Sequence, residues 1–549
     1  MSDWTVAEKA GNPFRALAKE ILDWFFRENP VLATAVGVHE HDKELGDFSR
    51  EAVQARDRAA RSFLSRLQAI DTAPLSLDDR LDKELLEIEL EVGIRLEEAR
   101  HEWRMNPNYA DAGVFGGYLL LTREFAPLDQ RLEALLSRLK QVPRVLADGK
   151  ANVTDPVQVF VETAIDTTRG GILFYQALVP MFAAQAASPA LRSEIETSNA
   201  QAVEALQDYL ASVEALRPKA KPEFGIGREL FDYLLRRRHL LDYDSETLHA
   251  KGLELFKETL REMRETGRRI DPDRTVDEII EDLKADHPAP KDLLEAYGDH
   301  MARSRQWVVE QGVVDIPPGE KLVIDETPAF LRPTIPYAAY MSPAPFEPDQ
   351  TGRFYVTPVD ESAPKDHQEQ QLRDHNNYGI PIKAIHEGYP GHHLQLCWSN
   401  QHPSPVRKLL GSSLFAEGWA FYLEQLAEDM GFVSGPKFRL IRLKDQLWRA
   451  ARIILDTALH TRGMTVDQAV DFFVDKVHLG RSNALAEVRR YTQSPTQPMS
   501  YRMGKLEIVK LASESRAAKG KDFNLRRFHN DLLSHGTLPP AMLRRILLG

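Results

Sequence analysis

The chain has 549 residues, of which 43% are hydrophobic and 28% charged, with a formal net charge of −12. These ordinary globular values exclude collagen-like, low-complexity and disulfide-scaffold classes, and the single cysteine, Cys397, permits no internal disulfide. The acidic balance argues against a dedicated nucleic-acid binder, so we expect no nucleic-acid partner.

The N-terminal residues lack the pattern of a secretion signal. Asp3, Glu8 and Lys9 stand where a signal peptide needs an apolar core. No uncharged apolar run approaches the roughly 20 residues of a membrane span. We therefore expect a cytoplasmic protein with no membrane partner, whose oligomeric state the sequence does not indicate.

Helical periodicity dominates the chain. Residues 76–103 repeat apolar side chains three to four residues apart, and Ser76 with Asp79 resembles a capping box. Similar patterns predict helices over 130–148, 190–216, 244–268, 290–312, 404–432, 436–461 and 465–476. The fold class is therefore mainly α. We expect a single helical domain over 1–549, with lobes 1–285 and 286–549 if the stretch at 285–292 is a boundary rather than a loop.

One region departs from this pattern. Residues 313–361 are rich in proline, aromatic and β-branched residues. The prolines forbid a long helix. Residues 322–325 and 353–357 are typical of short strands bounded by turns. A small β-sheet is thus predicted just before residue 386.

The stretch from Pro381 to Gln395 carries the most informative chemistry. Pro381 fits the first turn of a helix that carries His386 and Glu387. Adjacent His and Glu suit a zinc hydrolase, in which His binds the metal and Glu takes a proton from water. The second histidine usually follows four residues after the first, one helical turn away.

Here the next histidines stand six and seven residues after His386. On an unbroken helix His393 would lie roughly 10.5 Å along the axis, and His392 would point about 120° away. The helix must therefore break, and Pro390-Gly391 supplies the break. His392 is the expected second ligand, and His393 is the fallback.

A third ligand is expected from the following helix. Glu417 is a carboxylate in a mainly apolar stretch, where a buried charge needs a partner or a metal. The alternative is a helix-start acid that interacts with the dipole. Glu424 lies seven residues further on the same face and could orient a ligand histidine.

The motifs HEGYPGHHLQ and EGWAFYLEQL resemble a large, mostly bacterial family catalogued as domain of unknown function 885. The similarity extends to the GRFYVTP strand, the YRMGK segment at 501–505, and the tail that contains Phe528 and His529. The family is similar in architecture to helical zinc peptidases of the neurolysin and angiotensin-converting-enzyme kind. This resemblance implies a two-lobed helical body around a deep channel, and a Zn²⁺-dependent peptidase. Its motif H-E-x-x-P-G-H-x-x-Q implies His386, Glu387, His392 and Gln395, with Glu417 from the next helix.

Substrate-contacting residues are expected in two places. The strand 353–357, with Phe354 and Tyr355, is either an edge strand that pairs with an extended peptide or a structural hairpin. Tyr501 is the candidate donor to the oxyanion, since related-looking peptidases place a C-terminal tyrosine there. Two alternatives compete with this role: Tyr501 is a packed aromatic, or Tyr491 or His529 is the donor. A cation for a peptide carboxylate is expected from Arg490, Arg502 or Lys505.

The leading prediction is a zinc-dependent peptidase in which Glu387 activates water. A zinc hydrolase of a small non-peptide amide is the runner-up. The third class is a non-catalytic binding protein with a vestigial site, against which the intact base Glu387 argues.

Overall fold

In the computed structural model, residues 12–332, 335 and 337–549 are described. The segment 1–11, on which the expectation about secretion signals falls, lies outside the described residues. Helices account for 71% of the structure and strands for 3%, so the predicted mainly α fold class is confirmed. Within the described ranges, no helix is both long and apolar enough to cross a membrane.

The chain divides into two compact units, Met1–Leu230 and Phe231–Gly549. The expected boundary near residue 285 falls inside the second unit, between α13 (Val276–Ala285) and the turn η4 (Pro290–Asp292). The two-lobed channel implied by the resemblance stays a prediction.

The first unit is built from antiparallel and crossing helices. Its core lies among α7, α8, α9 and α10, where Leu120, Leu135, Ile165 and Leu206 are buried. Ser76 caps α5, since its hydroxyl accepts the Asp79 backbone N–H at 3.1 Å. The helices are α2 (Pro13–Glu28), α3 (Pro30–Val36), α4 (Arg50–Gln68), α5 (Leu77–Arg100), α6 (Glu102–Met105), α7 (Ala110–Thr122), α8 (Leu128–Asn152), α9 (Gln158–Ala183), α10 (Pro189–Glu214) and α11 (Gly227–Arg237), which ends in the second unit.

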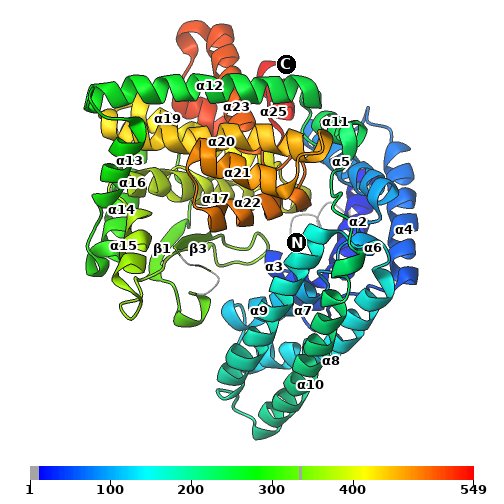
Figure 1. Ribbon diagram of the computed structural model, residues 1–549. Helices are drawn as coiled ribbons and strands as arrows, with labels where there is room; N and C mark the ends of the chain where they lie inside the picture. The colour runs from blue at the N-terminus through cyan, green and yellow to red at the C-terminus, as the bar shows by residue number, and fades with distance from the viewer. Residues whose placement is uncertain (1–11, 333–334, 336) are drawn as a thin grey trace. The chain divides into compact units, whose positions relative to one another are not determined.

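The second unit contains the sheet and the remaining helices. In Figure 1, α12 and α20 run side by side, and α19 packs on α23. The helices are α12 (Ser245–Ile270), α13, α14 (Leu293–Gln311), α15 (Lys365–Arg373), α16 (Gly379–Lys383), α17 (His392–Asn400), α18 (Pro405–Leu409), α19 (Ser413–Asp429), α20 (Pro436–Thr461), α21 (Val466–Val477), α22 (Arg481–Gln493), α23 (Ser500–Lys519), α24 (Leu525–Ser534) and α25 (Pro540–Leu548).

The single helix predicted over 404–432 is two helices, α18 and α19. The backbone is extended at Leu410 and Ser412, which ends one helix and caps the next. The Ser412 N–H donates to the Thr537 carbonyl at 2.8 Å, so a contact from the C-terminal tail holds the chain out of helical geometry. This contact is remote in sequence and therefore invisible to local periodicity.

The sheet has three strands, β1 (Lys321–Glu326), β2 (Ala338–Met341) and β3 (Thr351–Val356), in the order β1-β3-β2. The predicted strands at 322–325 and 353–357 correspond to β1 and β3. However, β3 is central: Phe354 pairs with Ile324 of parallel β1 and with Tyr340 of antiparallel β2. The expectation that 353–357 is a free edge for a peptide is therefore wrong. The four-residue β2 is too short, among flanking prolines, for its pattern to be recognised.

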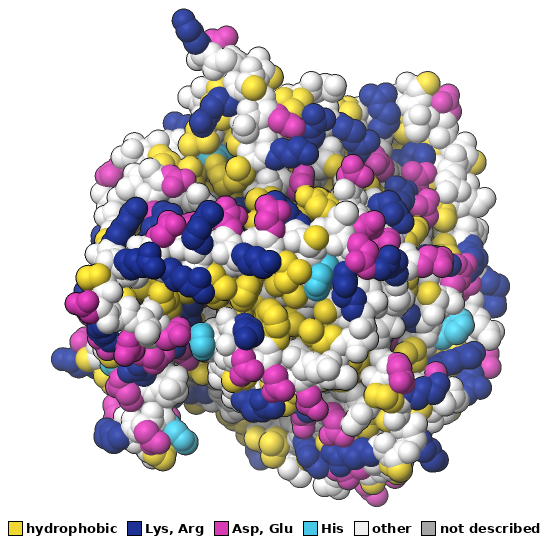
Figure 2. All heavy atoms as spheres, turned by 45° about the horizontal axis from the view of Figure 1, so that its top comes forward, with side chains coloured by type: hydrophobic (Ala, Val, Ile, Leu, Met, Phe, Trp, Pro, Cys, Tyr) yellow, Lys and Arg dark blue, Asp and Glu magenta, His cyan; other side chains and the backbone are white. Residues whose placement is uncertain are grey.

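Figure 2 shows that Lys and Arg side chains stand among Asp and Glu over the face it displays. Positive and negative side chains are mixed on that face, and neither sign forms one large patch. Most of these groups are solvated and screened. The charged side chains considered below are, in contrast, largely buried.

Candidate metal centre

A break in the helix brings the first two histidines together. Helix α16 continues into a π-helical turn, Ala384–Gly388, which carries His386 and Glu387. The chain then turns through the cis peptide Tyr389-Pro390, and α17 begins at His392. The ring centroids of His386 and His392 are 4.8 Å apart.

Gly391 allows this turn because the chain folds back on its own backbone. A Cβ at Gly391 would lie 1.9 Å from the His386 carbonyl oxygen and 2.3 Å from that of Ile385. No side chain fits there, so glycine is a steric requirement. The break at Pro390-Gly391 that the histidine spacing required is thus present.

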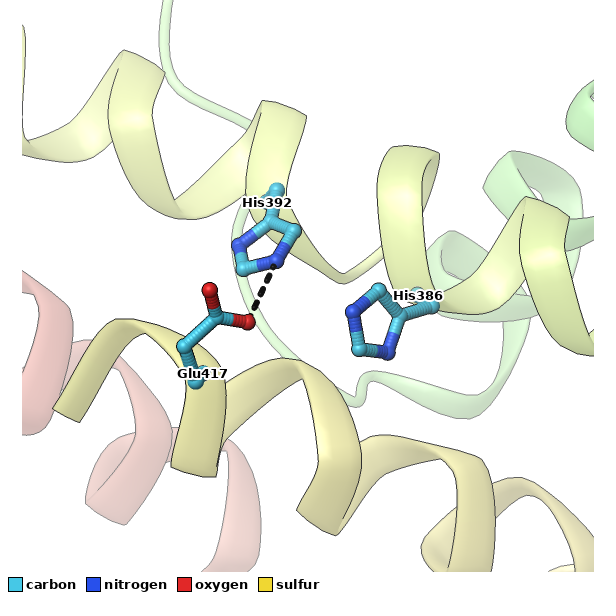
Figure 3. Close-up of side chains that lie close together, drawn as sticks. All are labelled: His386, His392 and Glu417. Atoms are coloured by element: carbon cyan, nitrogen blue, oxygen red, sulfur yellow. Dashed lines mark ion pairs between the residues drawn. The ribbon is translucent and has the colours of Figure 1, made fainter. Parts of the chain in front are cut away.

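Three side chains form a cluster that could hold a metal ion. His386, His392 and Glu417 each offer one ligand atom, and these atoms all lie within 4.8 Å of one another. Figure 3 shows Glu417 of α19 pointing toward the two imidazoles. Nε2 of His392 and Oε2 of Glu417 are 3.3 Å apart, within the range of an ion pair but outside hydrogen-bond geometry.

Glu424 orients His386. Its Oε1 lies 2.7 Å from Nδ1 of His386, and the Glu424 side chain is 2% exposed. A proton on Nδ1 donated to this carboxylate leaves the Nε2 lone pair available for a metal. This is the contact expected of Glu424 from its spacing.

A close helix crossing positions Glu417. A Cβ at Gly418 would lie 2.4 Å from the Gly504 carbonyl carbon, and one at Gly504 would lie 1.9 Å from the Leu414 carbonyl oxygen. The backbones of α19 and α23 therefore touch at these two glycines. As a result, Tyr501 of α23 lies against the Glu417 carboxylate.

The charges within the cluster reinforce one another. Burial acts to raise the pKa of Glu417, but His392, His386 and the Tyr501 hydroxyl outweigh it and lower the pKa to about 2. Burial acts to lower the pKa of His392, but Glu417 and the charge of Glu387 raise it above its usual value. Glu417 is therefore a carboxylate across the neutral pH range, which is the form that binds a cation.

Glu387 stands beside the cluster with its carboxylate free. Its charge acts on His392 and on the Tyr340 hydroxyl, which places it near both. It is half-buried, and across residues 12–332, 335 and 337–549 it forms no hydrogen bond or ion pair. An unpaired carboxylate at this position can accept a proton from water.

His393 belongs to a different network. Its Nε2 lies 2.9 Å from Oε1 of Glu320, and its Nδ1 lies 3.0 Å from the Tyr340 hydroxyl. The side chain is fully buried, and a Cβ at Gly352 would lie 2.6 Å from its ring. Both ring nitrogens are engaged, so His392 and not His393 faces Glu417. Sequence reasoning missed Glu320 and Tyr340, which no local pattern marks.

Two other expected residues are buried in supporting roles. Gln395 donates from Nε2 to the Thr537 hydroxyl at 2.7 Å. His529 has Nδ1 2.7 Å from the Val313 carbonyl oxygen and Nε2 3.1 Å from the Tyr422 hydroxyl. Both of its nitrogens are used, so it is not placed to donate to an oxyanion.

Each of the three cations expected to bind a peptide carboxylate has other neighbours in the structure. Arg502 is buried and lies near Glu258 and Glu262. Lys505 is buried too, with Nζ 3.3 Å from Oε1 of Gln446.

Arg490, the third expected cation, is paired with Glu487 at 3.0 Å and with Gln497 at 2.8 Å.

The two strand residues expected to contact substrate lie on β3. Phe354 packs in the core against Tyr297, and Tyr355 is half-buried on this central strand.

Arg449 and Arg452 of α20 were missed by sequence reasoning. The guanidinium carbon of Arg452 lies 4.4 Å from the Tyr501 ring centroid, and that of Arg449 lies 5.9 Å from it. The sequence does indicate that Arg452 is buried, since it stands between Ala450-Ala451 and Ile453-Ile454 in an apolar run.

Together these features define a mainly helical protein with a two-histidine, one-carboxylate cluster backed by a second carboxylate. The model of a family described as bacterial protein of unknown function (DUF885) matches residues 30–547, and the chain belongs to that family. A comparison with curated proteins gives no match.

Two solved structures are similar over almost their full length. One is described as a candidate lipoprotein of unknown function from Shewanella oneidensis, with 25% identity, a TM-score of 0.84, and coverage of 98% of this chain and 100% of that one. The other is a candidate lipoprotein from Colwellia psychrerythraea, with 18% identity, a TM-score of 0.83, and coverage of 98% and 99%. The cytoplasmic location expected from the sequence stays a prediction.

Proposed function

We propose that the protein is a zinc-dependent hydrolase whose substrates are peptides. The observation that carries this proposal is the convergence of His386, His392 and Glu417 beside the unpaired carboxylate of Glu387. A purely structural cluster has no need of a free carboxylate next to two imidazoles, because an unpaired partly buried charge is destabilising.

The residues present fit zinc. Two imidazole nitrogens and one carboxylate oxygen are the protein ligands of many catalytic zinc sites, which leave one position open. The buried Oε2 of Glu417 has no hydrogen-bond partner among the described residues, and a cation would satisfy it. When bound, zinc supplies a Lewis acid that polarises a carbonyl and acidifies water.

The chain's own residues carry the proton transfers. Glu387 accepts the proton of the attacking water and returns it to the leaving nitrogen. Glu424 keeps the His386 ring in one tautomer and orientation. The Tyr501 hydroxyl, next to Glu417, donates a hydrogen bond to the oxygen on which negative charge develops.

Peptides are favoured over small amides by the expected similarity in architecture between the family and helical zinc peptidases. A substrate cannot pair with β3 as an edge strand, since that strand has a neighbour on both sides.

The test replaces Glu387 by Gln, which keeps the shape of the side chain and removes the base. Zinc-loaded Glu387→Gln should bind zinc as the wild type does and hydrolyse a mixed peptide library about 10²–10⁴-fold more slowly. His478→Ala, an exposed histidine outside the cluster, is the control and should retain activity. Equal turnover by Glu387→Gln and wild type would refute the mechanism.

A further inference from the structure

Two arginines of α20 lie beside the candidate metal centre. Arg449 and Arg452 are three residues apart and share one helix face. Arg452 is 4% exposed, and the Arg449 side chain is 13% exposed. Both are largely withdrawn from water, unlike the Lys and Arg side chains that Figure 2 shows on the surface.

Aromatic rings lie close to both guanidinium groups, whose Cζ atoms stand over them. The Arg452 Cζ atom lies 4.5 Å from the Trp448 ring centroid and 4.4 Å from that of Tyr501. The Arg449 Cζ atom lies 4.9 Å from Trp448 and 5.7 Å from Phe421. Stacking of this kind fixes a guanidinium and leaves its N–H groups, which lie in its plane, free to bond.

Several of these N–H groups have no acceptor. Arg449 Nε, Arg452 Nε and Nη1, and the indole Nε1 of Trp448 are buried without a hydrogen-bond partner in the described part of the chain. The Nη2 of Arg452 lies 3.0 Å from Glu487, but that carboxylate also accepts from Arg490 and from the Tyr491 hydroxyl.

Another buried arginine of the same helix shows the contrast. Arg442 donates from Nε to Glu428 at 2.6 Å and from Nη1 to Gln446 at 3.3 Å. Buried donors are ordinarily satisfied in this way, since an unsatisfied one is destabilising. Arg449 and Arg452 each have one carboxylate partner, Asp445 at 3.7 Å and Glu487 at 3.0 Å, but the donors named above remain unsatisfied and call for an acceptor from outside the chain.

We propose that Arg449 and Arg452 bind a carboxylate of the substrate, a role that rests on the proposed hydrolase function. Guanidinium groups match the two oxygens of a carboxylate in geometry and charge. The carboxylate comes from the free carboxyl end of a peptide or from an Asp or Glu side chain, which offer the same oxygens. Neither arginine belongs to the cations expected from the sequence.

The position of the pair indicates which bond is cut. One phenol ring, that of Tyr501, separates Arg452 from Glu417 of the metal cluster. A peptide advances about 3.3–3.6 Å per residue, so the scissile bond lies within about three residues of the anchored carboxylate. When that carboxylate is the chain end, the protein removes short fragments from the carboxyl terminus.

The experiment compares three forms of one hexapeptide mixture whose side chains are uncharged. The first form has a free carboxyl end, the second has a C-terminal amide, and the third is the amide with one internal Asp added. Turnover by the zinc-loaded wild type is followed by mass spectrometry. The free-acid form should be cut near its carboxyl end, with kcat/KM at least about 30-fold above the plain amide, as expected when a buried charge pair is completed.

Variants assign this preference to residues. Arg449→Gln and Arg452→Gln should lose most of the preference, mainly through KM, so that the free acid and the plain amide are cut with similar kcat/KM. Arg439→Gln is the matched control on the same helix, because Arg439 is already paired with Glu262 at 3.1 Å and Glu428 at 2.8 Å. If Arg452→Gln fails to fold, the less buried Arg449 and the wild-type comparison of acid and amide still decide.

A binding measurement separates this proposal from the hydrolase proposal. Zinc-loaded Glu387→Gln is titrated calorimetrically with the acid and amide mixtures. The carboxylate site is supported when the acid binds more tightly than the plain amide and Arg449→Gln abolishes this difference. This result holds even when no form is hydrolysed. Preference for the amide with Asp supports it too and assigns the carboxylate to a side chain. Equal affinity of all three forms, the acid, the plain amide and the amide with Asp, overturns the proposal.

Discussion

At the residue scale, the role of Tyr501 is open to a direct test. Its ring packs on Arg452 and its hydroxyl lies against Glu417. Tyr501→Phe keeps the ring and removes only the hydroxyl. We expect kcat to fall roughly 10²–10³-fold, as when one oxyanion donor is removed, with KM and zinc content little changed. Full kcat in the variant would remove Tyr501 from the mechanism, and His529 could not replace it since both its nitrogens are bonded.

A second residue-scale prediction concerns Asp456, which is fully buried on α20. Burial raises its pKa to about 8, despite hydrogen bonds from the Thr496 and Met499 backbone N–H groups. Because the folded pKa exceeds the unfolded value, ionisation opposes folding, and stability is lost as pH rises from about 4 to 8. Asp456→Asn keeps an oxygen acceptor for Thr496 and removes the charge.

The Asn variant should therefore gain stability relative to the wild type as the pH rises from 5 to 8. Thermal unfolding at these two pH values is the measurement. A stability difference between the two proteins that does not change with pH would show that Asp456 does not titrate in this way.

At the element scale, the crossing of α19 and α23 places Tyr501 next to Glu417. Gly504→Ala introduces a Cβ 1.9 Å from the Leu414 carbonyl oxygen, so the two helices must separate. We expect a loss of stability of about 1–3 kcal/mol, typical of overpacking, together with weakened activity.

Gly298→Ala in α14 is the matched control. Nothing lies within 4 Å of a Cβ at Gly298, so alanine should stabilise the helix by roughly 0.5–1 kcal/mol. Denaturant unfolding of both variants measures the difference. Equal stability of Gly504→Ala and wild type would contradict the close crossing.

The sequence predicted elements well where their cause is local. The periodicity over 436–461 corresponds to α20 at both ends, because an amphipathic pattern and a helix-start proline suffice. The sequence could not show that β3 has two neighbours, since strand order depends on contacts between distant segments. The division of 404–432 into two helices depends in the same way on Thr537.

At the scale of the whole molecule, spacing alone predicted part of the candidate site. The six-residue step from His386 to His392 required a break in the helix, and the structure has that break at Pro390-Gly391. The apolar run around Arg452 marks a buried arginine, but its place beside Tyr501 could not be predicted, because it depends on how α20 lies against α23, which no local pattern encodes.

The central claim is that His386, His392 and Glu417 bind one catalytic zinc ion, and metal content per chain tests it most directly. Purified protein, dialysed against zinc and then freed of excess, should contain about one zinc per chain. The double variant His386→Ala, His392→Ala should contain almost none, while the exposed-site control His478→Ala should match the wild type. Stoichiometric zinc that persists in the double variant would contradict the account.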